Sequence, residues 1–420
     1  MVKYSRRLWI AAIVCLMLVV AQSAMAKTTL TVLVHGDFNA STLDEFMAEY
    51  SRLNPDIVFE KQVVPFDDLL TKVQISALSG QAPDIMHLYS LWGVELSRSG
   101  IIDAPPAYIV DDVKNNYAPV AVNGVTIDGQ IWGIPTEINN YALIYNNRIF
   151  EASGYAAPPQ TWDELVEAAK KMTVYDGQRN ISQYGYTFLV GWDSAVVHPY
   201  LSLLWSNGGD FLSPDGKQFI ANQPAGIEAL EQQLRLFNEG GSDVNGSVWD
   251  FPNGNIAMMT MFPAMKGMLR DNMGDRFFTD VRVAPIPRLK THVTALYTWF
   301  ATVSKSSPNK EEAWKFLHWL TAQTQPGKGS TRMGDHLVES IGALPSRLDD
   351  IENHPEALND HFSSVYVSEL QYSRAEPLIA RGAEIKTTLM NEIVEAWYGR
   401  KSAKDALDAA ARQINSLLAR

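Results

Sequence analysis

The stretch Gly129-Gln130-Ile131-Trp132-Gly133-Ile134-Pro135 decides the fold, together with the dipeptide Tyr145-Asn146 further along the chain. Glycine allows turns and close backbone approaches that other residues resist, and proline fixes its own φ angle. An apolar run follows the proline and ends in Tyr145-Asn146, which indicates a strand. We interpret the glycines and the proline as residues that shape the approach to this strand rather than as ligand contacts.

Before this stretch, predicted strands and helices alternate along the chain. Residues 28–34 are rich in β-branched side chains, which indicates a strand, and residues 57–64 and 83–89 are interpreted as two further short strands. Residues 67–78 indicate a helix, which Ser79-Gly80 ends. Repeated strand–helix–strand units are typical of α/β proteins with parallel sheets. The sequence therefore predicts an α/β fold.

Two helix starts have the pattern of a capping box, in which a Ser or Thr side chain and a Glu three residues later satisfy each other's backbone N–H groups. Thr42 with Glu45 is the first such pair, and Thr161 with Glu164 is the second. Pro158-Pro159 precedes the second pair and prevents an earlier helix start. We expect helices to begin at both places.

The first 26 residues have the three parts of a secretory signal peptide. Lys3, Arg6 and Arg7 give a positive start, residues 8–21 are uninterrupted apolar, and Ala24-Met25-Ala26 offers small residues for cleavage. A helix of 14 residues rises only about 21 Å, which is short of the roughly 30 Å of membrane hydrocarbon. We predict export to the periplasm through a cleaved signal rather than a membrane anchor.

Charge and cysteine content exclude several classes of function. The whole chain has a formal net charge of −12, and removal of the basic first segment makes the remainder more acidic. Such a chain does not favour nucleic acid or anionic lipid as a partner. The only cysteine, Cys15, lies in the signal segment. The mature chain is therefore expected to lack disulfides and thiolate metal sites, and its length favours two domains.

A series of motifs resembles one known family, the carbohydrate-binding, maltose-binding-protein-like receptors of ABC importers (bacterial family 1 solute-binding proteins). The glycine–proline stretch and Tyr145-Asn146 resemble the family's hinge region. Further motifs that resemble the family follow in its order: Thr161-Trp162-Asp163-Glu164, Leu204-Trp205-Ser206-Asn207-Gly208-Gly209-Asp210, Gly254-Asn255-Ile256-Ala257-Met258, Ala284-Pro285-Ile286-Pro287, residues 306–314 and Gly342-Ala343-Leu344-Pro345-Ser346-Arg347. The resemblance covers nearly the whole mature chain.

The resemblance implies a two-lobe periplasmic binding protein fold of type II, with mixed, mainly parallel sheets flanked by helices and a ligand cleft between the lobes. Closure about a hinge would bury the ligand. The implied divisions are a signal peptide at 1–26, an N-terminal lobe at 27–136 plus 291–344, a C-terminal lobe at 140–288 plus 348–420, and hinge crossings near 136–142, 286–296 and 342–348. One departure is the run Leu296-Tyr297-Thr298-Trp299-Phe300, where many members have a glycine-rich turn.

The implied function is a periplasmic receptor that captures a mono- or oligosaccharide and delivers it to the permease subunits of an ABC transporter. No catalysis, cofactor, metal or nucleic acid is implied, and a monomer is expected. A sugar has hydroxyls at its rim and apolar C–H faces, so its receptor needs aromatic rings beside polar side chains. Most such side chains follow the predicted strands or lie in the first crossing, whereas Trp299 lies in the aromatic run and Arg381 at the expected start of a late helix. We expect these to contact ligand: Asp37, Tyr89, Trp92, Glu137, Asn139, Asn140, Trp192, Asp193, Trp299 and Arg381.

Two alternatives stay open for the ligand and the activity. Arg374, Arg381 and Glu384 are expected to start a late helix that carries cleft residues in relatives, and the two arginines allow an anionic ligand such as a glycerol phosphodiester or a sugar acid. A secreted carbohydrate-active enzyme is the second alternative, although the adjacent acid pairs do not converge on one bond. His354 and His361 are expected on a surface segment, with no spacing that suggests metal.

Overall fold

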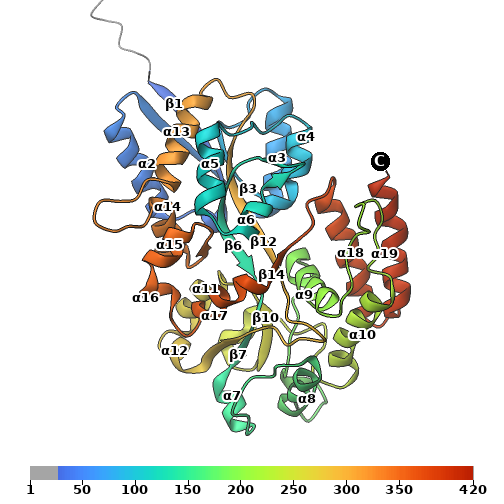
Figure 1. Ribbon diagram of the computed structural model, residues 1–420. Helices are drawn as coiled ribbons and strands as arrows, with labels where there is room; N and C mark the ends of the chain where they lie inside the picture. Colours follow the sequence, from blue (N-terminus) through green and yellow to red (C-terminus); the bar gives the residue numbers. More distant parts are fainter. Residues whose placement is uncertain (1–26, 420) are drawn as a thin grey trace, which may run out of the picture.

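The computed structural model describes residues 27–419, so the predicted signal segment lies outside the described residues. Two lobes, each built around its own sheet, stand one above the other in Figure 1. The upper lobe holds a seven-stranded sheet and the lower lobe a three-stranded sheet. The predicted two-lobe α/β architecture is confirmed by this arrangement.

The larger sheet has the strand order β13-β6-β12-β3-β1-β2, with β14 paired to β12. Its strands are β1 (Thr28–His35), β2 (Ile57–Val64), β3 (Ile85–Tyr89), β6 (Ile134–Asn140), β12 (Thr294–Val303), β13 (Leu344–Pro345) and β14 (Ser373–Ala375). Strand β1 pairs parallel with β2 and β3, whereas β12 is antiparallel to both β3 and β6. The sheet is therefore mixed: β1 with β2 and β3, and β12 with β14, are parallel pairs, whereas β12 with β3 and β6, and β6 with β13, are antiparallel.

The smaller sheet has the order β10-β7-β11 and is antiparallel. Its strands are β7 (Ala142–Asn146), β10 (Met258–Met261) and β11 (Val281–Ala284). Two short antiparallel pairs complete the strands: β4 (Thr126–Ile127) with β5 (Gln130–Ile131), and β8 (Val174–Tyr175) with β9 (Ile181–Gln183). The expectation of mainly parallel sheets is thus wrong for the smaller sheet, because β10 and β11 both run antiparallel to the central strand β7.

Helices surround both sheets (Figure 1). Around the larger sheet lie α2 (Ser41–Leu53), α3 (Phe66–Leu78), α4 (Gly93–Arg98), α5 (Ala107–Asn116), α6 (Pro119–Asn123), α13 (Lys310–Thr321), α14 (Arg332–Asp335) and α15 (Leu348–Asn353). The remaining helices are α7 (Asn147–Ala152), α8 (Trp162–Met172), α9 (Asp193–Ser206), α10 (Pro224–Asn238), α11 (Met265–Met273), α12 (Arg276–Asp280), α16 (Pro355–Leu358), α17 (Ser363–Glu369), α18 (Gly382–Trp397) and α19 (Ala403–Leu418). Short 3₁₀ helices are η1 (Gly36–Phe38), η2 (Ser90–Trp92), η3 (Val248–Asn253) and η5 (Leu370–Tyr372), and η4 (His336–Ile341) is a π-helix.

The two predicted capping boxes have different outcomes. Thr161 and Glu164 form a complete capping box at the start of α8, as predicted. At α2 the N-cap is Ala40, and no side chain caps the helix. The hydroxyl of Thr42 instead lies 2.7 Å from Nδ1 of His336. The Thr42 hydroxyl, which the local pattern assigned to the N-cap of α2, therefore forms a tertiary hydrogen bond with η4 instead.

The chain passes between the two sheets over short connections. Only Tyr141 separates β6 of the larger sheet from β7 of the smaller sheet, and residues 285–293 connect β11 with β12. The predicted crossings near 136–142 and 286–296 overlap these connections. The predicted crossing near 342–348 contains β13 at the edge of the larger sheet and leads into α15. Their action as a hinge stays a prediction.

The glycines of the opening motif serve two different needs. Gly129 has a φ of +78° between β4 and β5, where a left-handed residue is required. Gly133 leads into β6 and lies against β12. A Cβ atom at this position would meet the ring of Phe300 and would lie 2.7 Å from the carbonyl oxygen of Ala301. Absence of a side chain at 133 therefore lets β6 and β12 approach.

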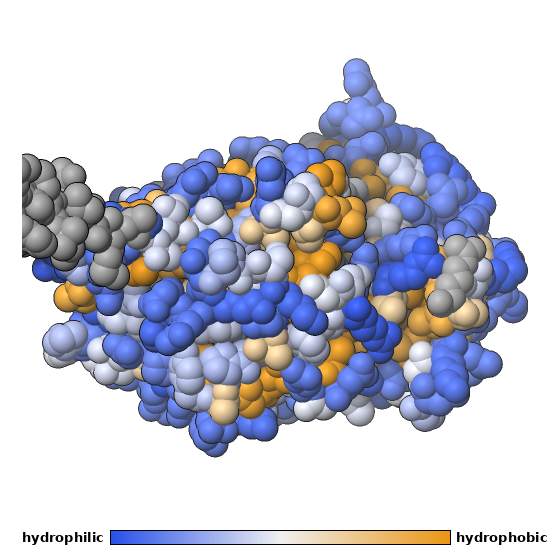
Figure 2. Space-filling model, turned by 90° about the horizontal axis from the view of Figure 1, so that it is seen from above, coloured by the Kyte–Doolittle hydropathy of each residue, from blue (hydrophilic) through white to orange (hydrophobic). Residues whose placement is uncertain are grey.

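Large apolar side chains gather in two buried clusters, and each cluster includes residues from strands of both sheets and from the helices that cover them. On the face seen in Figure 2, hydrophilic residues cover most of the surface and apolar residues form separate areas between them. Within residues 27–419, no helix is long and apolar enough to cross a membrane.

Gly133→Ala is expected to lower the free energy of unfolding by about 1–3 kcal/mol, because the added methyl group overpacks the contact with β12. Urea denaturation of the mature protein measures this change. Gly177→Ala is the matched control, since a Cβ atom there meets nothing within 4 Å. Equal stability of the two variants would show that the close approach at Gly133 is not required.

Candidate functional site

A cavity of about 370 Å³ lies where the larger sheet faces α9 and η3 of the other lobe. This volume is within the roughly 300–1,000 Å³ typical of small-molecule sites. The lining residues come from both lobes: His35, Asp37, Phe66, Asp67, Tyr89, Glu137, Asn139, Gly191, Trp192, Ser194, Trp249, Phe262, Ala264, Tyr297, Trp299, Ile341 and Ala343. A ligand in this cleft would therefore touch both lobes at once.

Strands β6 and β12 provide the floor of the cleft. Side chains two residues apart share one face of a strand, which places Glu137 with Asn139 and Tyr297 with Trp299. Tyr297 pairs directly with Asn139 across the two strands. The register then shifts between Thr298 and Phe300, so Trp299 sits at a β-bulge. Bulges re-aim side chains and are common beside functional sites.

His35, at the end of β1, stacks on Trp299 with 3.9 Å between the ring centroids. The side chain is 5 % exposed, and neither ring nitrogen has a hydrogen-bond partner within residues 27–419. Burial, and in second place the neighbouring His87, holds the pKa of His35 well below its usual value. The imidazole is therefore neutral near pH 7 and offers one donor and one acceptor.

Three carboxylates line the cleft. Glu137 is buried, and its Oε2 accepts a hydrogen bond from Thr136 Oγ1 at 2.9 Å and lies 3.4 Å from His87 Nε2. Asp37 in η1 and Asp67 in the first turn of α3 are exposed. Carboxylates accept hydrogen bonds from hydroxyl or amine groups, which suits a polar ligand.

The opposite wall is aromatic. Trp192 is the N-cap residue of α9 and meets Phe262 edge to face, with 5.3 Å between ring centroids. Trp249 in η3 is 48 % exposed although it lines the cleft. Such an exposed indole at a cleft rim offers a flat apolar face to a ligand.

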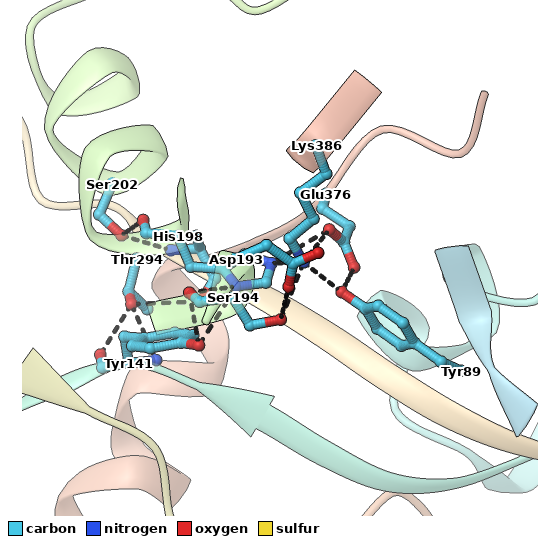
Figure 3. A network of polar contacts seen from close by, with 10 residues as sticks. Tyr89, Tyr141, Asp193, Ser194, His198, Ser202, Thr294, Glu376 and Lys386 are labelled. Carbon is cyan, nitrogen blue, oxygen red and sulfur yellow. Dashed lines mark hydrogen bonds and ion pairs between the residues drawn. The ribbon is translucent and has the colours of Figure 1, made fainter. Parts of the chain in front are cut away.

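A buried polar network (Figure 3) shares Tyr89 and Ser194 with the cleft lining. Lys386 of α18 is 4 % exposed, and its Nζ lies 3.0 Å from Oε2 of Glu376, which follows β14. The same Nζ donates to the hydroxyl of Tyr89 at 2.5 Å and to Oγ of Ser194 at 3.0 Å. Tyr89 in turn donates to Glu376 Oε1. Elements of both lobes thus share one ion pair.

Protonation in this network follows from burial and from the ion pair. Burial alone would raise the pKa of Glu376, but Lys386 and then His198 lower it to about 2. Burial, and then Lys386, lowers the pKa of His198. His198 Nδ1 lies 2.9 Å from the backbone oxygen of Ser194, and its Nε2 lies 3.1 Å from Oε2 of Glu376, so a neutral His198 donates to one of these two oxygens. In this network the positive charge of Lys386 is therefore paired with the negative charge of Glu376.

The structure brings six of the ten predicted ligand contacts to the cleft. These are Asp37, Tyr89, Glu137, Asn139, Trp192 and Trp299. Whether they contact ligand stays a prediction. The hydroxyl of Tyr89 is held by Glu376 and Lys386, so this residue offers the cleft its ring rather than its hydroxyl.

The other four predicted contacts do not line the cleft. Trp92 is buried behind it, stacked on Phe66 at 5.7 Å. Asn140 faces the opposite side of β6 from Asn139 and donates to the backbone oxygen of Tyr366 at 2.9 Å.

The remaining two are Asp193, which accepts from Ser194 Oγ at 3.2 Å, and Arg381, whose Nε lies 3.1 Å from Glu384. From the sequence, Arg374 was expected at the start of the late helix. It lies instead in β14, where it pairs with Asp210 at 2.8 Å. Strand pairing with β12 explains this difference.

Several lining residues were not among the predicted contacts. His35 follows directly on a predicted strand, which is the same signal that selected Asp37. Tyr297 lies in the aromatic run already noted, Asp67 starts a predicted helix, and Phe66 directly precedes that helix. Phe262 directly follows the strand-like stretch 256–261, so the same signal applied to it. Trp249 had no distinguishing local pattern, because only tertiary packing brings η3 to the cleft.

One further group of side chains could hold a metal ion by distance alone. Ligand atoms of Asp335, Glu339 and His354 all lie within 4.8 Å of one another. The Asp335 carboxylate, however, already accepts from Lys328, Ser330, Gln325 and His354. We therefore interpret this group as an ion-pair cluster. His354 is buried, which corrects the expectation of a surface position.

Comparison with known proteins agrees with this geometry. The profile of the family described as bacterial extracellular solute-binding protein matches residues 36–325. A binding protein of Brucella abortus is 24 % identical over 98 % of this chain and 99 % of its own length. The maltotriose-binding protein of Pyrococcus abyssi is 26 % identical over 74 % of this chain and 64 % of its own length.

A solved structure shows the same fold. The ABC substrate-binding protein of Listeria monocytogenes in complex with cycloalternan superposes with a TM-score of 0.78 at 22 % identity, over 94 % of this chain and 99 % of that one. This similarity confirms the two-lobe fold.

Lys386→Met is expected to lower the free energy of unfolding by about 3–5 kcal/mol, because it leaves the buried Glu376 carboxylate without its cation. Adding Glu376→Gln removes that unpaired charge and should restore more than half of the loss. Urea denaturation of the single and double variants measures the effect. A double variant as unstable as the sum of the two single changes would contradict a coupled ion pair.

Proposed function

The chain belongs to the bacterial extracellular solute-binding protein family, and we propose that it is the periplasmic substrate-binding protein of an ABC transporter for a carbohydrate. The ligand is a mono- or oligosaccharide, captured in the cleft by lobe closure and delivered to the permease subunits. The observation that carries this proposal is the composition of the cleft, in which Trp192 and Trp249 line the same cavity as the carboxylates of Asp37, Asp67 and Glu137.

The physical match between this cleft and a sugar rests on two kinds of surface. Indole rings bury the C–H face of a sugar with little loss of side-chain entropy. Glu137, Asp37 and Asn139 supply acceptors for hydroxyl groups. The maltotriose and cycloalternan named for the two relatives above are carbohydrates, which supports the same ligand class here.

Delivery requires that the lobes move and that the protein be exported. We propose the lobe boundaries 27–136 plus 291–344 and 140–288 plus 348–420, with hinge action at the three crossings. The short connections at Tyr141 and residues 285–293 support this proposal, since few backbone angles need change for closure. Residues 1–26 act as the cleaved signal, and the mature protein acts in the periplasm as a monomer.

The two alternatives carry less support. Arg374 and Arg381, which left an anionic ligand open, are paired with Asp210 and Glu384 and do not line the cleft. For a carbohydrate-active enzyme, two acids must flank one glycosidic bond. The relatives reported above are binding proteins. Turnover of a chromogenic glycoside by the mature protein would favour the enzyme.

A thermal-shift screen of sugars, sugar acids and glycerol phosphates tests the proposal. Binding to the native state alone stabilises by RT ln(1 + [L]/Kd), about 2.7 kcal/mol at a hundredfold excess over Kd. We expect a carbohydrate to raise the melting temperature without being consumed. A screen in which glycerol phosphates shift melting and carbohydrates do not would contradict a carbohydrate receptor.

Trp192→Ala should weaken binding of the carbohydrate found in that screen at least tenfold, about 1.4 kcal/mol, because it removes an aromatic face from the cleft. Isothermal titration measures the affinity, and circular dichroism checks the fold. Phe278→Ala is the control, since Phe278 is an exposed aromatic residue that does not line the cleft. Unchanged affinity in Trp192→Ala would remove this residue from the site.

A further inference from the structure

The charged side chains that line the cleft are all acidic. Asp37, Asp67 and Glu137 line it, and among residues 27–419 no lysine or arginine does. The chain as a whole is acidic, with a net charge of −12, so its long-range field also attracts cations. A neutral ligand would leave these negative charges without a counter-charge when the lobes close and water leaves.

The nearest buried cation does not relieve this imbalance. In Figure 3 the ammonium of Lys386 points to Glu376, Tyr89 and Ser194, and these three groups take its hydrogen bonds. Glu376 neutralises its charge at 3.0 Å. Lys386 is therefore not available to an anionic group of a ligand.

Buried polar atoms at the cleft also favour a hydrogen-bond donor. Asn139 is 3 % exposed, and its Oδ1 accepts no hydrogen bond from any residue between 27 and 419. Neither ring nitrogen of His35 has a partner among these residues, and the imidazole is neutral because burial lowers its pKa, so it does not repel a cation and offers one acceptor as well as one donor. Buried acceptors without partners are costly, which points to a ligand that donates to them.

Aromatic rings complete the pattern. Trp192, Trp249 and Trp299 line the same cleft as the three carboxylates, with Tyr89 and Tyr297 beside them. The face of an aromatic ring attracts a cation, most strongly for tryptophan. Rings that bury a sugar face thus also stabilise a positive charge attached to that sugar.

We propose that the cleft binds a carbohydrate that carries a protonated amine, an amino sugar or a short oligomer of one. This inference rests on the proposed function and narrows its ligand class. An ammonium group has three donors and no acceptor, which matches carboxylates and unpartnered acceptors, whereas a sugar hydroxyl both donates and accepts. The remaining hydroxyls of the ligand use the indole N–H groups and the other polar atoms.

The test compares matched sugars at pH 7 by isothermal titration with the mature wild-type protein. The probes are glucosamine, galactosamine and the β-1,4-linked disaccharide of glucosamine, each beside its N-acetyl form and its hydroxyl parent. At least one amine should bind tenfold or more tightly than both of its neutral forms. Equal or tighter binding of the neutral forms overturns this inference and leaves the carbohydrate receptor in place. Binding by none of the panel also overturns this inference, whereas the receptor proposal is decided separately by the thermal-shift screen described above.

Charge-removing variants locate the effect in the cleft. The quantity measured is the affinity for the amine divided by the affinity for its hydroxyl parent. This ratio should fall at least tenfold in Asp37→Asn, in Glu137→Gln, or in both variants. Asp37 is exposed, so its variant keeps the test sound if Glu137→Gln fails to fold. Asp111→Asn on the surface of α5 is the control and should keep the wild-type ratio. A ratio unchanged in both cleft variants overturns the assignment.

Discussion

The antiparallel pairing of β6 with β12 places the cleft floor and both connections between the sheets on the same two strands. Glu137 and Asn139 lie on one strand, and Tyr297 and Trp299 lie on the other. One residue beyond the end of β6 the chain enters β7 of the smaller sheet, and β12 is reached from β11 over a short segment. Any motion of one lobe relative to the other therefore acts next to the residues that would hold a ligand.

The buried ion pair of Lys386 and Glu376 extends this arrangement to the C-terminal helices. It fixes Tyr89 of the larger sheet against Ser194 of α9, so that the rear of the cleft has a defined shape. A charge pair this deeply buried is stable only when every donor and acceptor is satisfied. Because Lys386 is held by Glu376, its positive charge is not offered to the cleft. The carboxylates that line the cleft therefore determine the charge that surrounds a ligand.

Local patterns were sufficient for much of the fold. Strand β2 was predicted within its observed bounds, and the Thr161 capping box formed, because both depend on residues close in sequence. The cap expected from Thr42 failed because His336, almost three hundred residues away, takes its hydroxyl. The same distinction applies to the site: strand ends marked Asp37 and Tyr89, whereas alternation along β6 decides that Asn139 and not Asn140 faces the cleft. Trp249 could not be found from sequence, since its position depends on the packing of η3 against the other lobe.

A crystal structure of the mature protein with its tightest-binding carbohydrate tests the central claim most directly. The account predicts the sugar between the lobes, stacked on Trp192 and hydrogen-bonded to Glu137. A sugar bound instead in the surface groove beside Tyr108 and Trp319, between α2, α5 and α13, would contradict it.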